Sequence, residues 1–256
     1  MRISIFSAFY PFRGGIAQFN ARLFRSLEKS NETKAFTFKK QYPDFLFPGK
    51  TQYVTEADQV DPIPAERIVS PFNPFTYFSA IRKLKRDKPD VLIVNHWMSF
   101  FGFCFGVLAR FQSKKTMRVA LVHNLIPHEQ RFFDRLLNRF FLNSFDRFVV
   151  LSEPVQQDIL RMKPAAIVWC KEHPWYDHFG DRLDRSKACQ KLGLDPQLKT
   201  LLFFGLVREY KGLDVLLEAF NELDAGFQLV IAGVVYGQDT RYKSLINQNN
   251  NKERIH

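Results

Sequence analysis

The sequence predicts an α/β protein with two domains, each built on a doubly wound parallel sheet, the second of them incomplete. Short apolar runs alternate with segments of helical periodicity from residue 2 to residue 248. This alternation is typical of parallel strands covered by helices on both faces. The chain has 256 residues, 46% of them hydrophobic, which suits one or two soluble domains with a sizeable core.

The first domain is expected to repeat a strand, a loop and a helix. Arg2–Tyr10 alternates along a strand, and the Val-Leu-Ile-Val run of Asp90–Asn95 is typical of a strand buried on both faces. The other strands expected are Lys34–Phe38, Arg118–His123, Arg147–Leu151 and Ala165–Cys170. Five helices are expected. One begins at the Gly14-Gly15 pair, one begins at Ser152, and the others span Phe75–Arg86, Phe100–Phe111 and Glu129–Leu142. Prolines interrupt Tyr42–Pro74, which is expected to be irregular.

The second domain shows the same alternation over a shorter stretch. Its expected elements are the helix Ser186–Leu192, which Gly193 ends, the strand Thr200–Gly205, the helix Gly212–Leu223, the strand Phe227–Ala232 and the helix Thr240–Gln248. Two strand-helix units make about half of a doubly wound domain, and residues 254–256 are expected to open a further strand. The predicted organisation is a first domain over 1–174, a linker over 175–185 and a partial second domain over 186–256.

Composition limits the classes of function. The formal net charge is +11, but the basic residues are scattered and accompany no nucleic-acid-binding motif, so we expect no nucleic-acid partner. Contact with anionic lipid head groups and a merely solvated surface both remain open. Three cysteines without a close pair argue against a disulfide framework or a structural zinc site and favour the cytoplasm. Val91–Phe111 is expected to be a buried strand and a helix rather than a membrane span.

A glycine pair, Gly14 and Gly15, lies between the first strand and the first helix. Glycines there allow a ligand to approach the backbone, and a helix N-terminus binds phosphate. The alternative is a tight turn that requires a positive φ. The fingerprints of dinucleotide-binding enzymes and of P-loop ATPases are both absent.

A second candidate site follows the strand that ends at Gly205. Arg208 and Lys211 come next, and Gly212 opens a helix. A guanidinium and an ammonium at the carboxyl end of a parallel strand suit a diphosphate. An ordinary solvated turn explains the same residues equally well.

The run from Phe203 to Gly212 resembles the Gly-Arg-x-x-x-x-Lys-Gly signature of family 4 glycosyltransferases, which have the GT-B fold. The resemblance implies that Arg208 and Lys211 hold the diphosphate of a sugar nucleotide, although Leu206 displaces the arginine by two positions. Tyr10–Ala17 is similar to the family's first glycine loop, which faces the donor phosphates and the acceptor. Val122-His123-Asn124 is similar to the family's Val-His-Asp, which implies a substrate role for His123.

The resemblance implies a retaining transferase that moves a hexosyl unit from a UDP- or GDP-sugar to a saccharide or lipid-linked acceptor. It implies no cofactor and no metal, and a cytoplasmic enzyme of polysaccharide synthesis, peripheral at the inner face of the membrane. The family's two glutamates separated by seven residues are absent from this chain, so we expect poor turnover from it alone. The alternative is a non-catalytic binding module on a truncated GT-B scaffold.

The expected helix Glu129–Leu142 has two distinct sides. One holds Phe132, Phe133, Leu136, Leu137, Phe140 and Phe141, and is expected to cover the sheet. The other holds the row Arg131, Arg135 and Arg139. This row is either a solvated face or a contact with a membrane or a lipid phosphate. His128 and Glu129 are expected to cap the helix or to contact the acceptor.

Overall fold

The computed structural model describes residues 1–43, 51–56, 58, 60–127, 131–174, 180–235 and 240–256. The described residues up to 174 form one compact unit, and those from 180 to 256 form a second. The predicted limits of the linker, 175–185, stay a prediction, because residues 175–179 lie outside the described part of the chain.

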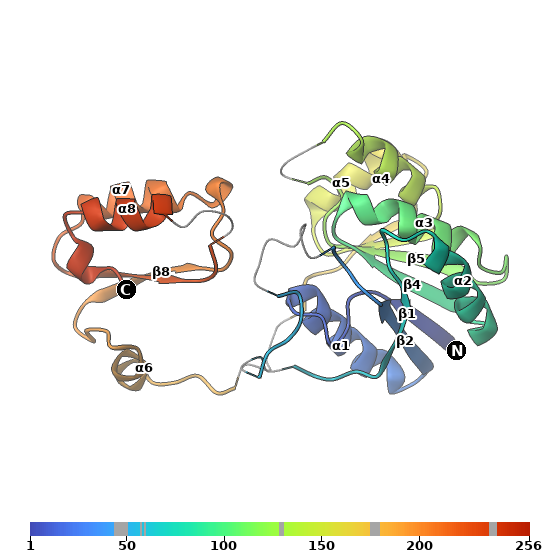
Figure 1. Ribbon diagram of the computed structural model, residues 1–256, viewed down its shortest axis with the longest axis horizontal. Coiled ribbons are helices and arrows are strands. Elements are labelled where there is room, and N and C mark those ends of the chain that lie inside the picture. The colour runs from blue at the N-terminus through green and yellow to red at the C-terminus, as the bar shows by residue number, and fades with distance from the viewer. Residues whose placement is uncertain (44–50, 57, 59, 128–130, 175–179, 236–239) are drawn as a thin grey trace. The chain divides into compact units, whose positions relative to one another are not determined.

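A parallel sheet organises the first unit (Figure 1). Its strands are β1 (Arg2–Phe6), β2 (Glu32–Phe38), β3 (Ala65–Val69), β4 (Val91–His96), β5 (Met117–Val122), β6 (Arg147–Val150) and β7 (Val168–Cys170). They run in the order β3-β2-β1-β4-β5-β6-β7. The chain returns from β3 to β4, on the other side of β1, and this reversal of direction makes the sheet doubly wound.

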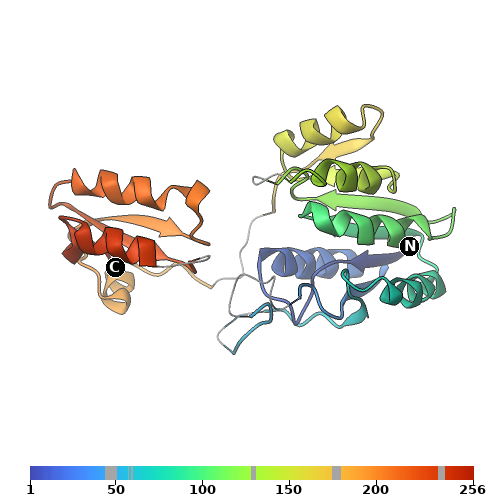
Figure 2. The ribbon, with the colours of Figure 1, turned by 45° about the horizontal axis from the view of Figure 1, so that its top comes forward.

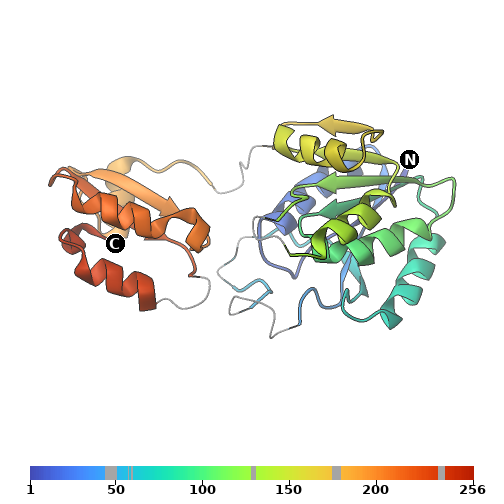
Figure 3. The ribbon, with the colours of Figure 1, turned by 90° about the horizontal axis from the view of Figure 1, so that it is seen from above.

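Helices cover both faces of this sheet. They are α1 (Gly15–Glu28), α2 (Phe75–Asp87), α3 (Gly102–Arg110), which the 3-10 turn η2 (Ser99–Phe101) precedes, α4 (Asp134–Leu142) and α5 (Glu153–Met162). Helix α1 packs on one face, whereas α2 to α5 lie side by side on the other (Figures 2 and 3). Strand β1 contributes side chains to the cores on both faces of the sheet. Ile3 and Ile5 pack with α1, and Phe6 belongs to the core beneath α2 to α5. The predicted α/β class with parallel sheets is confirmed.

Aromatic rings fill the larger core. Phe6, Phe38, Phe101 and Phe105 are fully buried. Their rings contact one another edge to face, tilted or stacked, with centroids 5.1 to 6.2 Å apart. Such pairs add to the free energy gained by burying the rings. This core explains part of the high phenylalanine content of the chain.

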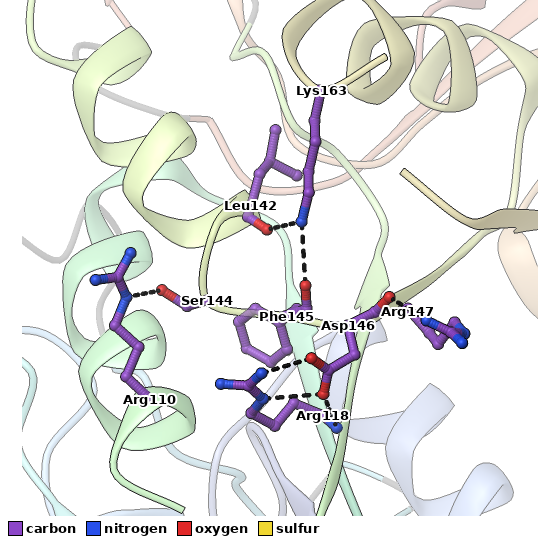
Figure 4. A network of polar contacts seen from close by, with 8 residues as sticks. All are labelled: Arg110, Arg118, Leu142, Ser144, Phe145, Asp146, Arg147 and Lys163. Carbon is purple, nitrogen blue, oxygen red and sulfur yellow. Dashed lines mark hydrogen bonds and ion pairs between the residues drawn. The ribbon is translucent and has the colours of Figure 1, made fainter. Parts of the chain in front are cut away.

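The turn between α4 and β6 joins several elements of the first unit (Figure 4). Arg118 of β5 donates to both carboxylate oxygens of Asp146, from Nε at 2.9 Å and from Nη2, and its backbone N–H donates to Asp146 at 2.9 Å. Lys163 donates to the carbonyls of Leu142 and Phe145 at 2.8 and 3.2 Å. These bonds fix the entry of β6, and the Arg118 guanidinium lowers the pKa of Asp146.

Two sequence predictions for the first unit were wrong. Tyr42–Pro74 is not irregular throughout, because Ala65–Val69 forms the edge strand β3, in which Ile68 and Val69 are buried. The helix expected over Glu129–Leu142 begins at Asp134, and Phe132 and Phe133 lie in a turn before it. Phe132 and Leu136, expected to cover the sheet, are 97% and 71% exposed.

The second unit is small and partial. Strands β8 (Lys199–Phe204) and β9 (Phe227–Ala232) pair in parallel, and α7 (Leu213–Asn221) and α8 (Thr240–Gln248) cover one face (Figures 1 and 3). Helix α6 (Arg185–Leu192) ends at Gly193 in the left-handed conformation, as predicted. Ile255 pairs with Leu229 of β9, and the His256 backbone N–H donates to the Leu229 carbonyl at 2.8 Å. Residues 255 and 256 therefore add to the sheet edge where a further strand was expected.

Val91–Phe111 forms β4, η2 and α3, in agreement with the prediction of a strand and a helix. Among the residues described, none of the helices is long and apolar enough to cross a bilayer.

Candidate functional site

The predicted site residues fall into two groups, one in each unit. In the first unit, Gly14 precedes α1 with φ +120°, a conformation that only glycine adopts readily. A Cβ atom on Gly14 or Gly15 would meet no described atom within 4 Å. The first turn of α1 holds no acidic residue, and no side chain caps it. This end of the helix therefore offers open space and backbone N–H groups that an anion can bind.

His123 follows β5 at the carboxyl edge of the same sheet. Its backbone N–H donates to the His96 carbonyl at 2.8 Å, and its ring lies edge-on to Phe19 of α1 with centroids 4.7 Å apart. Its Nε2 atom is buried and has no hydrogen-bond partner among the described residues. Burial, and next the charge of His173, lower the pKa of His123 to about 4. A neutral imidazole offers one donor and one acceptor to a ligand.

His96, at the end of β4, differs from His123 in its surroundings. Its ring is fully buried and stacks on Phe141 of α4 with centroids 4.1 Å apart. Burial, and next the charge of His123, lower the pKa of His96 to about 3, whereas Asn138 opposes the shift. His96 therefore belongs to the core, where its ring packs against an aromatic side chain.

A buried polar chain behind the glycine loop was missed by sequence reasoning. Asn20 of α1 donates to the Ser7 hydroxyl at 2.6 Å and to the Ala8 carbonyl at 2.8 Å. Asn95 of β4 donates in turn to Asn20. All three polar side chains are fully buried, so they fix the start of α1 against the ends of β1 and β4. The signal in the sequence was an asparagine directly after the apolar run Val91–Val94.

His173 was also missed. Its ring lies 5.7 Å from that of Phe19, so Phe19 stands between two histidines. His128 and Glu129, proposed as a cap or an acceptor contact, lie outside the described residues.

In the second unit, Gly205 follows β8 directly with φ +111°, and its N–H donates to the Ala232 carbonyl at 2.9 Å. The Lys211 ammonium lies 3.4 Å from the point that a Cβ on Gly205 would occupy. The 3-10 turn η3 (Glu209–Lys211) brings it back over the strand end, and Gly212 then begins α7. Arg208 is partly buried just before this turn. The structure thus brings Lys211 and Gly205 together at the carboxyl end of the strand.

Arg241 of α8 is a further member of this site that the sequence did not indicate. Its guanidinium pairs with Glu209 at 3.2 Å and with Asp214 at 2.7 Å. These two carboxylates flank the loop that carries Lys211. By pairing with both, Arg241 offsets the negative charge of the two carboxylates beside Lys211.

Gly233 directly follows β9 and lies beside Gly205. A Cβ on Gly233 would lie 1.8 Å from the backbone oxygen of Gly205. Only glycine permits this approach of the two backbones just beyond β8 and β9. The described residues contain no group of His, Cys, Asp or Glu arranged to hold a metal ion.

Comparisons with known proteins identify a family and a fold. Residues 13–169 match the family model described as Glycosyltransferase Family 4. No curated protein matches the sequence.

Among solved structures, the match to HepE from Anabaena, in complex with UDP and glucose, covers 100% of this chain and 68% of the HepE chain, with a TM-score of 0.70 and 13% identity. TarM from S. aureus matches 70% of this chain and 35% of its own, with a TM-score of 0.51 and 13% identity. The match to UDP-GlcNAc 2-epimerase from Neisseria meningitidis, bound to UDP-GlcNAc, covers 100% of this chain and 71% of the epimerase chain, with a TM-score of 0.55 and 14% identity. The predicted GT-B-like fold is confirmed.

Proposed function

Because the chain belongs to Glycosyltransferase Family 4, we propose that it moves a hexosyl unit from a nucleotide-diphosphate sugar to a saccharide or lipid-linked acceptor. The observation that carries the proposal is the family match over residues 13–169. It favours transfer over epimerisation, although an epimerase shares the fold. HepE, whose structures hold UDP, glucose and UDP-glucose, supports UDP as the nucleotide.

In the proposed reaction, the acceptor oxygen forms a bond to the anomeric carbon, and the bond from that carbon to the diphosphate oxygen breaks. The acceptor proton leaves with the nucleotide diphosphate, and the configuration of the sugar is retained. Arg208 and Lys211 bind the diphosphate and stabilise the charge that develops on it. These two cations make the step independent of a metal. The neutral His123 hydrogen-bonds a substrate hydroxyl, and Gly14 and Gly15 admit the substrate to the N-terminus of α1.

The proposed setting is the cytoplasm, with peripheral attachment to the inner face of the membrane. For these 256 residues alone we propose weak nucleotide binding and poor turnover. The described part of the second unit has a two-stranded sheet, and Leu202 and Phe204 of β8 are 62% and 76% exposed. The same observation supports the second candidate, a non-catalytic binding module.

Calorimetric titration with UDP and GDP tests the donor site. We expect a dissociation constant above about 10 μM, weakened roughly tenfold or more by Arg208→Ala or Lys211→Ala, because one charge-assisted hydrogen bond contributes about 1.5–3 kcal/mol. Lys187→Ala on α6, where the lysine is also exposed, is the matched control. Equal affinities for all four proteins would refute the assigned site.

Release of UDP from UDP-glucose, with and without a saccharide acceptor, separates the two candidate functions. Acceptor-dependent release that Lys211→Ala abolishes supports the transferase. Nucleotide or saccharide binding without any release supports the binding module.

A further inference from the structure

Large apolar side chains are exposed on the helices α2, α3 and α4 and in the segments just before α2 and α4. They are Phe72, Phe75, Phe78, Phe103, Phe132 and Leu136, each at least 48% exposed. Phe75 and Phe132 are 92% and 97% exposed. A single exposed apolar residue is ordinary, but several on neighbouring helices indicate an interaction surface.

Phe103 of α3 joins the three helices. Its ring lies 6.3 Å from Tyr77 of α2 and stacks on Phe140 of α4 at 5.5 Å. In Figures 2 and 3 the three helices lie side by side on one face of the sheet. The exposed rings therefore belong to one surface, which we call the α2–α4 face.

The charges on this face are almost all positive. The basic residues of the three helices are Arg82, Lys83, Lys85, Arg86, Arg110, Arg135 and Arg139, and all are exposed. Their two acidic residues point inward. Asp87 accepts from Ser4 and Lys34, and Asp134 accepts from Ser99 and from the backbone N–H of Arg131.

Basic side chains also lie over the aromatic rings. The Arg82 guanidinium is 5.4 Å from the Phe78 centroid, and that of Arg110 is 4.5 Å from Phe140. Lys83 pairs with Glu66 of β3, so part of its charge is offset. The remaining surface combines protruding rings with guanidinium groups beside them.

We propose that the α2–α4 face docks onto an anionic phospholipid surface. Aromatic side chains favour the boundary between head groups and acyl chains, and basic side chains favour anionic head groups. A second copy of the chain fits less well, because a symmetric contact would set the exposed basic residues of one copy against those of the other. The contact is peripheral, and it does not depend on nucleotide binding or on sugar transfer.

Vesicle sedimentation without nucleotide tests the proposal on the full chain. The vesicles are phosphatidylcholine alone and a 7:3 mixture of phosphatidylcholine and phosphatidylglycerol. We expect binding to the anionic vesicles, little binding to the neutral ones, and a loss of binding at high salt because salt screens exposed charges.

Two sets of variants separate the contributions of the rings and of the charges. Phe75→Ser with Phe132→Ser should weaken binding by about 100-fold, since burying one large apolar side chain is worth about tenfold or more. Replacing Arg131, Arg135 and Arg139 by glutamine should also weaken it by about 100-fold, because each basic residue near an anionic surface contributes about 1 kcal/mol.

Matched controls lie in the second unit. Leu183→Ser with Leu192→Ser removes two leucines that are 53% and 64% exposed, and replacing Arg182, Lys187 and Lys191 by glutamine removes three exposed charges. Both controls leave the α2–α4 face unchanged, and surface substitutions rarely affect folding. They should therefore bind anionic vesicles within about twofold of the unchanged chain. Circular dichroism checks that every variant folds.

Three results would overturn the proposal: equal binding to neutral and anionic vesicles, equal loss in the controls, or no vesicle binding. A dimer in solution that Phe75→Ser with Phe132→Ser dissociates, without vesicle binding, would assign the face to a second copy. A chain that binds no UDP can still bind vesicles, so this test and that of the transfer activity fail independently.

Discussion

Replacing Gly233 by alanine should loosen the strand ends that carry the loop with Lys211. The added Cβ would lie 1.8 Å from the Gly205 oxygen and 2.8 Å from its carbonyl carbon. Backbone atoms cannot rotate away as a side chain can, so the ends of β8 and β9 must separate by more than about 1 Å to restore an ordinary contact of about 3.5 Å. Overpacking of this kind costs about 1–3 kcal/mol. A gain of about 0.4–1 kcal/mol from the stiffer unfolded chain offsets part of it.

Hydrogen exchange measured by mass spectrometry is the suitable assay, because the three tryptophans at 97, 169 and 175 precede the second unit and their fluorescence would not report on it. A net cost of about 1–2 kcal/mol accelerates exchange through local opening by roughly 5–30-fold in peptides from β8 and β9. Peptides from β4 and β5 serve as the internal reference.

Gly226→Ala is the matched control. Its Cβ would lie 2.9 Å from an oxygen of the Asp224 side chain, which can move aside. We expect exchange in the control to stay within about threefold of the unchanged chain. Unchanged exchange in Gly233→Ala, together with unchanged UDP affinity, would refute the reasoning that the close approach of Gly205 and Gly233 shapes the loop.

Two further predictions concern the first unit. Burial lowers the pKa of His96 to about 3 and that of His123 to about 4. The unfolded chain therefore binds more protons below pH 6.5, and the free energy of unfolding should fall by roughly 4 kcal/mol from pH 7 to pH 5. Urea unfolding followed by tryptophan fluorescence should show this fall and a smaller one in His96→Phe; a flat profile would contradict it. Asp146→Asn should cost about 1 kcal/mol at pH 7 by weakening the pair with Arg118. Arg118 lowers the pKa of Asp146, so this cost should shrink below about pH 4, where the carboxylate protonates in the unfolded chain; a cost that persists at pH 2.5 would assign it to packing.

The elements predicted correctly were those whose periodicity was strong. In the Val-Leu-Ile-Val run of β4, Leu92 and Val94 are buried in one core, and Val91 and Ile93 are half-buried against the core on the other face. Because both faces are covered, the sequence of this strand lacks alternation. Strand β3 could not be recognised, because only Ile68 and Val69 of its five residues are buried and edge strands carry a weak pattern. Ser152 stands at the N-cap of α5, as predicted, but its side chain makes no capping hydrogen bond.

Helix α4 shows the limit of periodicity. Its apolar residues occupy more than one side, and the sequence does not reveal which side faces the sheet. Phe141 and Leu142 face the sheet, whereas Phe132 and Leu136 remain exposed. The close packing of α3 against α4 decides which residues are buried. A Cβ atom added to Gly102 of α3 would lie only 3.0 Å from the backbone oxygen of Leu137 in α4.

For the candidate site, the sequence indicated the residues with a recognisable motif and missed their partners. Gly205, Lys211 and Gly212 lie close together because eight residues of chain join them. Arg241 and Gly233 reach the same loop from another strand and helix, and nothing local in the sequence marks them. Asn20 and Asn95 meet across 75 positions for the same reason.

The central place of β1 in its sheet has a consequence for synthesis of the protein. Strand β1 pairs with β2 on one side and with β4 on the other, and the Arg2 N–H bonds to Asp90 across 88 positions. At about 5–20 residues per second, a growing chain carries β1 for roughly 5–20 s before β4 has been made. During that interval the strand that holds Ile5 and Phe6, both fully buried in the folded protein, has one unpaired edge. The yield of folded protein should therefore depend on the rate of translation and on chaperones that shield the nascent amino-terminal segment.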